Sequence, residues 1–140
     1  MSPSSKPRSN KLLLVDADFR TSQRLAELLA EDGFEVEVVR DGAAAIARLS
    51  RAPMPGTLIT ELSVALADGS AIARYGRSLD PGLRVIVLTR HPNLLVASSF
   101  GGSAPAVLTK PLDYARLLDL LHDGGRGEAA VEAGALSLRP

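Results

Sequence analysis

The amino-acid sequence predicts an α/β fold in which helices cover both faces of a five-stranded parallel sheet. Between Lys11 and His122, five short apolar runs alternate with five segments of helical pattern. Unbroken apolar runs are typical of strands that are buried on both faces, as in parallel sheets. Right-handed crossovers between such strands leave few other topologies. A chain of 140 residues is long enough for one domain of this kind.

The five predicted strands are short and mostly apolar. They are KLLLV, FEVEVV, GTLIT, RVIVLT and AVL, at residues 11–15, 34–39, 56–60, 84–89 and 106–108. In RVIVLT most residues are β-branched, and prolines stand on both sides of the run, at Pro81 and Pro92, which is typical of a strand.

Five predicted helices follow the strands. The first contains RTSQRLAELLAEDG, with Asp18 as its N-cap and Gly33 as its C-terminal stop. The second predicted helix, GAAAIARLS, is led by Asp41, and the sequence Asp68-Gly69-Ser70 opens the third. The helical pattern also predicts helices over Asn93–Phe100 and Pro111–His122, the last with its leucines at 117, 118 and 121 facing inward.

The two ends of the chain differ from the middle in composition. Residues 1–10 are polar and rich in proline and serine, which predicts a disordered lead-in. Residues 123–140 are mostly small or polar, which predicts a flexible tail or linker. The predicted folded domain is therefore residues 11–122.

The overall composition excludes several classes of protein. Sixteen basic and sixteen acidic residues leave no net charge, whereas proteins that bind nucleic-acid phosphates usually carry a basic excess. The absence of cysteine excludes a disulfide framework, and two isolated histidines do not make a zinc site. No apolar run approaches the roughly 20 residues of a membrane span, nor is there a secretory signal. We expect a cytoplasmic protein that binds neither membranes nor nucleic acid.

Chemistry-bearing side chains follow four of the predicted strands. They are Asp16, Glu61, Thr89 and Lys110. In open parallel sheets, ligands bind outside the carboxyl ends of the strands, near the point where the strand order reverses. These four residues are therefore the candidate site.

Four segments, taken in order, resemble the response-regulator receiver domain of two-component signalling. They are LLLVDAD, LITELSVALADGS, VIVLTR and VLTKPLD, and the resemblance covers about Lys11 to His122. It implies a flavodoxin-like, doubly wound (βα)5 fold with strand order 2-1-3-4-5. In the family, two acids after the first strand and an aspartate after the third hold Mg²⁺, and that aspartate accepts a phosphoryl group from a histidine kinase. The family's phosphate contacts are matched here by Thr89 and Lys110, and its first acid by Asp16.

Two positions depart from the family pattern. Ala17 stands at the second acid, and Glu61 stands at the phosphoacceptor aspartate. Mg²⁺ needs several oxygen ligands, so we expect its binding to be weak or absent and no cofactor to be held. Glu61 is longer by one carbon–carbon bond, roughly 1.5 Å, and a misplacement near 1 Å costs phosphoryl transfer about 10²-fold. Asp18 is expected to cap its helix and not to replace the lost acid.

The role of Glu61 is open at the level of sequence. In one hypothesis its carboxylate reaches toward Lys110 and Thr89, imitates a phosphoryl group in part, and so holds the conformational switch of the domain permanently in one state. Two alternatives for Glu61 are a domain in which no switch is left and a surface carboxylate that merely lies beside a cation. For Asp16 the alternative is a simple turn cap, which is a common role of a lone aspartate. Val107 stands where the family carries a switch aromatic, so the usual relay from the threonine is missing.

The sequence thus predicts a receiver that is not an enzyme, is not phosphorylated and acts as a protein-interaction module. The resemblance implies a protein partner or a homodimer at the surface of residues 93–100, 106–108 and 113–122, and a histidine kinase or a downstream effector as the partner. Two alternatives stay open: a phosphorylatable single-domain response regulator, and a small flavodoxin-like enzyme or nucleotide binder. The absence of a glycine-rich phosphate loop counts against the last.

Overall fold

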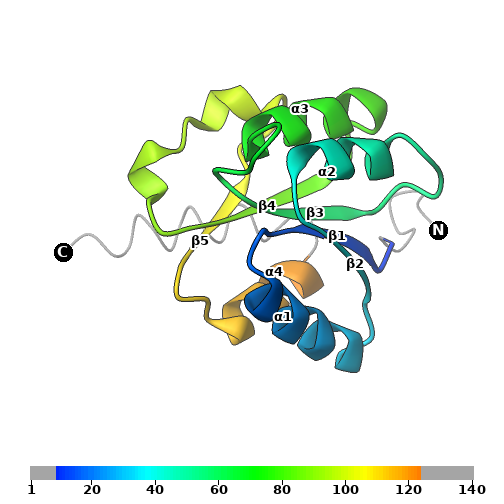
Figure 1. The fold of residues 1–140 in the computed structure, drawn as a ribbon, viewed down its shortest axis with the longest axis vertical. Coiled ribbons are helices and arrows are strands. Elements are labelled where there is room, and N and C mark those ends of the chain that lie inside the picture. The colour runs from blue at the N-terminus through cyan, green and yellow to red at the C-terminus, as the bar shows by residue number, and fades with distance from the viewer. Residues whose placement is uncertain (1–8, 124–140) are drawn as a thin grey trace.

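A computed structural model describes residues 9–123 and contains the expected sheet of five parallel strands (Figure 1). The strands lie in the order β2-β1-β3-β4-β5, which confirms the predicted topology. Their bounds are β1 (Lys11–Val15), β2 (Glu35–Val39), β3 (Thr57–Glu61), β4 (Arg84–Thr89) and β5 (Ala106–Thr109). The predicted lead-in over 1–10 and the predicted tail over 123–140 lie outside the described residues, except for residues 9, 10 and 123.

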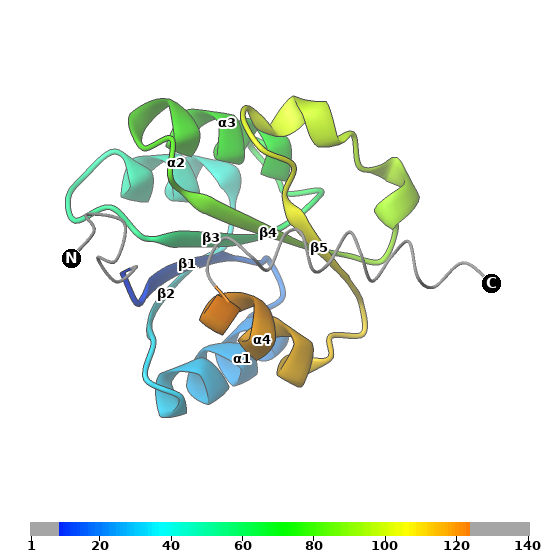
Figure 2. The ribbon, with the colours of Figure 1, turned by 180° about the vertical axis from the view of Figure 1, so that it is seen from behind.

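Helices cover both faces of the sheet. On one face lie α1 (Phe19–Glu31) and α4 (Tyr114–Asp123), and on the other lie α2 (Gly42–Leu49) and α3 (Gly69–Leu79) (Figures 1 and 2). Because successive strand side chains point to opposite faces, β1 supplies Leu12 and Leu14 to the first layer and Leu13 and Val15 to the second. All four are buried, which places the core on both sides of the sheet.

Aspartate N-caps start three of the helices, as the sequence predicts. The carboxylate of Asp18 accepts hydrogen bonds from the N–H groups of residues 20 and 21, Asp41 accepts from Ala44 (2.7 Å), and Asp68 accepts from Ala71 (3.0 Å). Each bond satisfies a backbone donor that the first helical turn leaves without a partner. The caps fix where each chain segment leaves the carboxyl edge of the sheet.

The helix predicted over Asn93–Phe100 is wrong. The chain forms two short 3-10 helices there, η2 (Pro92–Leu94) and η3 (Ala97–Phe100). Val96 has an extended backbone (φ −110°, ψ 104°) that separates the two, and Gly101 ends the second in the left-handed region (φ 66°). Segments this short do not gain the cooperativity of an α-helix, and their position depends on tertiary contacts.

Arginines from α3 attach this segment to the rest of the fold. Arg74 donates to the carbonyl oxygen of Ser99 (2.8 Å), and Arg77, which is buried, donates to the carbonyl oxygens of Phe100 (3.3 Å) and Ser103. The Phe100 side chain is fully buried in the core layer on the same face. The segment between β4 and β5 is therefore fixed against α3, beside which it lies in Figure 1.

The last helix begins later than the sequence suggests. The expected range was Pro111–His122, but α4 starts at Tyr114, after Asp113 has accepted a hydrogen bond from the N–H of Ala115 (3.1 Å). Leu117 and Leu121 are buried as predicted, whereas Leu118 is only half-buried and Leu120 takes an inward position. None of the described helices is both long and apolar enough to cross a membrane.

Candidate functional site

The four candidate side chains lie at the carboxyl edge of four neighbouring strands. Glu61 and Thr89 are the last residues of β3 and β4, and Asp16 and Lys110 directly follow β1 and β5. The N–H of Lys110 donates to the carbonyl oxygen of Thr89 (2.9 Å), which continues the β4–β5 ladder by one residue. The parallel register thus assembles the residues that the sequence singles out.

Glu61 and Lys110 form an ion pair across the end of β4. The Oε2 atom of Glu61 contacts the Nζ atom of Lys110, and the two side chains are 24% and 15% exposed. Charges that are this far removed from water interact more strongly than a surface pair does. In the structure the carboxylate of Glu61 therefore contacts Lys110, and the role of this contact stays a prediction.

Asp16 is buried at the start of the loop between β1 and α1. Its Oδ1 atom accepts a hydrogen bond from the N–H of Asp18 (2.9 Å), which is the turn-capping role of a lone aspartate. Its Oδ2 atom is also buried and has no hydrogen-bond partner among the described residues. A buried acceptor without a protein partner is uncommon in native structures.

The two residues after Asp16 add no ligand to this edge. Ala17 has no donor atom in its side chain and is exposed. Asp18 uses its carboxylate as the N-cap of α1, and the hydrogen bonds from the backbone N–H and the hydroxyl of Thr21 hold the pKa of Asp18 below its ordinary value. Asp18 therefore does not take the place of the missing acid.

Thr89 is buried, and its hydroxyl oxygen accepts a hydrogen bond from the N–H of His91 (2.9 Å). Within residues 9–123, no hydrogen bond joins Thr89 to Glu61, so the expected reach of Glu61 to the hydroxyl has no counterpart in the structure. Val107 is half-buried in β5, where it pairs in register with Val87. The site therefore combines one ion pair, one buried aspartate and a threonine that is engaged in its own loop.

The donor set does not fit a magnesium ion. Mg²⁺ requires near-octahedral oxygen coordination and is usually held through one or two free carboxylates together with waters or phosphate oxygens. Here Glu61 is paired with a cation and Ala17 supplies no oxygen, so Asp16 alone is unneutralised. Among the residues that the structure describes, no group of three or more histidine, cysteine, aspartate or glutamate side chains is arranged to hold a metal.

A second surface feature escaped the sequence analysis. A groove of about 380 Å³ lies between α1 and the segment that leads into α4, lined by Arg20, Thr21, Arg24, Leu25, Leu28, Leu112 and Tyr114. The signal in the sequence is a pair of arginines four residues apart, followed by Leu28, on one helix. The facing wall, Leu112 and Tyr114, is far away in the chain and could not be found from that pattern.

Comparisons with known proteins agree with the fold. The family model described as "Response regulator receiver domain" matches residues 12–122. A response regulator receiver protein of Anaeromyxobacter sp. (strain Fw109-5) is 34% identical over 112 residues, which are 79% of this chain and 46% of that protein. A signal receiver domain of an HD domain-containing protein from Pseudomonas fluorescens Pf-5 is 25% identical with a TM-score of 0.74, covering 89% of this chain and 99% of that one.

A third similar protein is the receiver domain of a sensor histidine kinase from Pseudomonas aeruginosa PAO1, whose structure has a magnesium ion coordinated in its active site cleft. Its identity is 21% and its TM-score 0.71, over 83% of this chain and 97% of that one, so it shows the fold alone. The chain spans about half the length of the curated relatives it matches, 46% and 60% for the first two. The match of the family model to residues 12–122, together with the sheet order, shows that the chain belongs to the response regulator receiver domain family of two-component systems.

Proposed function

We propose that this receiver domain is not phosphorylated and acts as a phosphorylation-independent protein-interaction module. Receiver domains interact with histidine kinases and effectors in two-component systems, and they are generally signalling modules without enzymatic activity. The observation that carries the proposal is the ion pair between Glu61 and Lys110, at the position where the family has its phosphoacceptor and its phosphate-binding lysine.

The pair opposes phosphoryl transfer in two ways. A carboxylate that attacks phosphorus must have a free oxygen about 3 to 3.5 Å from it and in line with the leaving group. Here the Oε2 atom of Glu61 is held by Lys110, and the extra methylene displaces both oxygens from the place an aspartate would reach. The lysine that would contact the incoming phosphate is occupied by the same contact.

Weak or absent magnesium binding acts in the same direction. A unit-charge pair about 4 Å apart is worth roughly 4 kcal/mol gross at an effective dielectric near 20, and the charge on the metal is double. The loss of the acid at Ala17 and the neutralisation of Glu61 therefore remove a large part of the attraction for the ion. We expect the domain to work without a cofactor.

Acetyl phosphate tests this proposal directly. The full chain is incubated with acetyl phosphate and Mg²⁺, and its intact mass is measured. We expect no adduct. A stoichiometric gain of about 80 Da, the mass of one phosphoryl group, would instead establish a phosphorylatable response regulator.

Glu61 is proposed to act as a static, partial substitute for the phosphoryl group. Its carboxylate brings one charge and two oxygens to Lys110, where a phosphoryl group would bring about −1.5 to −2 charges and three oxygens. The Glu61→Asp and Glu61→Gln variants shorten or discharge this contact, so both should change the set or the amount of proteins that the immobilised domain retains. Unchanged binding in both variants would leave a domain without a switch.

The proposed interaction face is the segment between β4 and β5 together with β5 and α4. Leu94 and Val96 are 63% and 61% exposed there, whereas Leu95 is half-buried and Phe100 belongs to the core. Exposed leucine and valine side chains close together are typical of protein-binding surfaces. We propose a protein partner in the cytoplasm for this face, and neither a membrane nor a nucleic acid.

A matched pair of surface variants tests this face. Leu94→Ser with Val96→Ser should abolish capture of the partner from a lysate of the source cells. Leu79→Ser removes a side chain that is 52% exposed on α3, outside this face, and should leave capture unchanged. Equal capture by all three proteins would contradict the assignment.

A further inference from the structure

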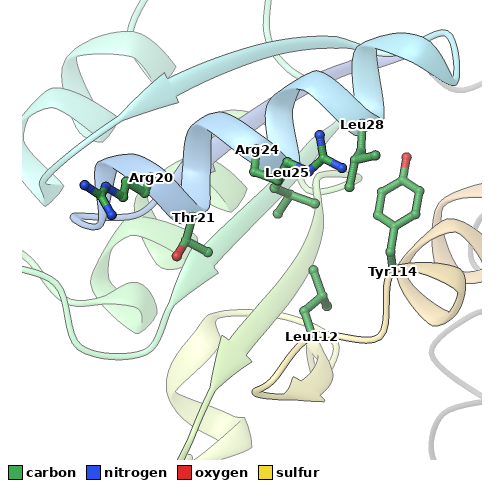
Figure 3. A pocket seen from close by; sticks show the side chains of 7 residues that line it. All are labelled: Arg20, Thr21, Arg24, Leu25, Leu28, Leu112 and Tyr114. Carbon is green, nitrogen blue, oxygen red and sulfur yellow. The ribbon is translucent and has the colours of Figure 1, made fainter.

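The groove beside α1 has apolar walls and a charged rim. Figure 3 shows Arg20 and Arg24 on α1, with Leu112 and Tyr114 on the opposite side and Leu25 and Leu28 between them. The hydroxyl of Tyr114 donates to the Asp32 carboxylate (2.7 Å) at the end of α1, which fixes the ring as a wall of the groove. The groove is thus a formed feature of about 380 Å³.

The exposed charges on α1 run against the helix dipole. Arg20 and Arg24 occupy its N-terminal half, and Glu27 and Glu31 its C-terminal half. Cations are favoured near a helix C-terminus and anions near the N-terminus, so this distribution disfavours the isolated helix. None of the four side chains forms an ion pair with another residue in the described part of the chain.

We propose that a second copy of this chain covers the groove, with the two α1 helices packed antiparallel around a twofold axis. The charge pattern is complementary to itself in that arrangement. When Arg24 of each copy faces Glu27 of the other, the antiparallel register also places Arg20 opposite Glu31, because moving back along one helix means moving forward along the other. A twofold contact uses the same patch on both copies, so one sequence pattern supplies all four pairs.

The same contact covers one rim of the groove. Arg20, Arg24 and Leu28 line the groove from α1, and in this register Leu28 of each copy lies level with Gln23 of the other helix. Leu28 is half-buried in the single chain and would become covered. The antiparallel helix dipoles add a further attraction to the charge pairs.

This dimer surface differs from the face proposed for the protein partner in its main elements. The dimer contacts come from α1, whereas the partner face is centred on the exposed Leu94 and Val96, and the two share Tyr114 at the start of α4. The groove lies between α1 and the start of α4, which cover one face of the sheet (Figure 2), whereas Leu94 and Val96 belong to the segment between β4 and β5. The inference therefore does not rest on the proposed function, and its outcome is independent of whether the domain is phosphorylated.

Charge reversal followed by mixing tests the arrangement. Sedimentation of the full chain is measured from about 1 μM to about 1 mM, the range of weak association. We expect a monomer–dimer equilibrium that shifts to monomer at high salt. Arg24→Glu and Glu27→Arg should each weaken it roughly tenfold or more, since two attractive pairs become two repulsive ones.

The decisive sample is the equimolar mixture of the two variants. In a mixed dimer the chain with two acids at positions 24 and 27 faces the chain with two arginines, so both contacts are attractive again. We expect dimer to reappear in the mixture, and also in the double variant Arg24→Glu/Glu27→Arg. The thermal midpoint of each variant, measured at a concentration where the parent is monomeric, should stay close to that of the parent, because positions 24 and 27 are exposed.

Arg90→Glu is the matched control, because it makes the same charge change at an exposed position in the loop after β4. It should dimerise as the parent does. A parent chain that stays monomeric at all concentrations overturns the proposal, as does a dimer that both reversals leave intact, or a mixture that stays monomeric. Those results would assign the groove to residues 124–140, which carry Glu128 and Glu132, or to an acidic helix of another protein.

Discussion

The contact between Glu61 and Lys110 balances two charges that are largely removed from water. If the carboxylate is lost, the ammonium of Lys110 keeps its burial and loses its partner. Breaking a fully buried pair from one side costs about 3–5 kcal/mol, and partial exposure lowers that figure. Glu61→Gln should therefore reduce the free energy of unfolding by about 1–2 kcal/mol, measured by urea denaturation.

A double-mutant cycle separates this pair from other effects of the substitution. Lys110→Met removes the cation, and the double variant Glu61→Gln/Lys110→Met removes both charges. The double variant should be more stable than the sum of the single changes predicts, since neither charge is then left alone. Strict additivity would mean that the two side chains do not interact in solution.

Strand-end residues could be predicted from the sequence because the alternation of strands and helices determines which residues reach the carboxyl edge of the sheet. Asp16, Glu61, Thr89 and Lys110 all lie there. What the sequence could not decide is which of them touch. The contact of Glu61 with Lys110, and the use of the Thr89 hydroxyl by the N–H of His91, depend on side-chain rotamers and loop backbone.

At the scale of elements, the aspartate caps make stability depend on acid. The N–H of Ala71 and the hydroxyl of Ser70 hold the pKa of Asp68 below its ordinary value of 3.8, and hydrogen bonds from Thr21 do the same for Asp18. A carboxyl whose pKa is lowered by folding stabilises the native state at pH values above 3.8, and this contribution is lost as the pH falls through the lowered pKa.

Asp68→Asn tests that dependence, because asparagine is also a good N-cap but carries no titratable group. In the variant, the loss of stability between about pH 5 and pH 2 should be smaller than in the parent chain, while stability near neutral pH changes little. Urea unfolding at a series of pH values measures both quantities. Equal slopes in the two proteins would show that Asp68 contributes nothing to acid sensitivity.

The 3-10 segment between β4 and β5 depends on Arg77. This buried side chain donates to backbone carbonyl oxygens of Leu83 and Phe100, at 3.2 and 3.3 Å, and to that of Ser103. Arg77→Met would leave these buried acceptors without their donor, at a cost of about 1–3 kcal/mol for a single such group. We expect lower stability and faster amide hydrogen exchange over residues 97–105.

Arg74 provides the comparison for this prediction. Its side chain is exposed, and its hydrogen bond to the carbonyl oxygen of Ser99 competes with water. Arg74→Met should therefore change stability and hydrogen exchange much less than Arg77→Met does. If the two variants lose the same stability and show the same hydrogen exchange, burial of Arg77 is not what stabilises the segment between β4 and β5.

These elements also show where sequence patterns end. The helices after Asp18, Asp41 and Asp68 could be predicted because a cap and the apolar spacing behind it are local. The segment after β4 could not, because its course is set by contacts with α3 and by the burial of Phe100. The late start of α4 likewise could not be predicted, because it depends on how the chain turns between β5 and Asp113.

At the scale of the whole molecule, the scaffold and the chemistry of the site are separable. Both core layers are built from strand and helix residues that do not include Ala17, Glu61 or Lys110. The residues at these positions can therefore differ from the family pattern while the sheet and its helices stay intact. Because folding does not require phosphoryl chemistry in this architecture, the domain can retain its surfaces under the proposed function, in which the switch is fixed.

That separation predicts that the lost chemistry can be restored. Ala17→Asp together with Glu61→Asp would return the missing acid and shorten the acceptor, beside an Asp16 whose Oδ2 atom has no partner among the described residues. The shorter side chain should also release Lys110 for phosphate. We expect the double variant, incubated with acetyl phosphate and Mg²⁺, to gain about 80 Da in intact mass.

Each single variant is a control for this experiment. It lacks either the metal ligand at position 17 or the shorter acceptor at position 61, and it should gain little mass. A double variant that folds but stays unmodified would place the defect elsewhere at this edge of the sheet, for example in the Thr89 hydroxyl, which accepts a hydrogen bond from the N–H of His91.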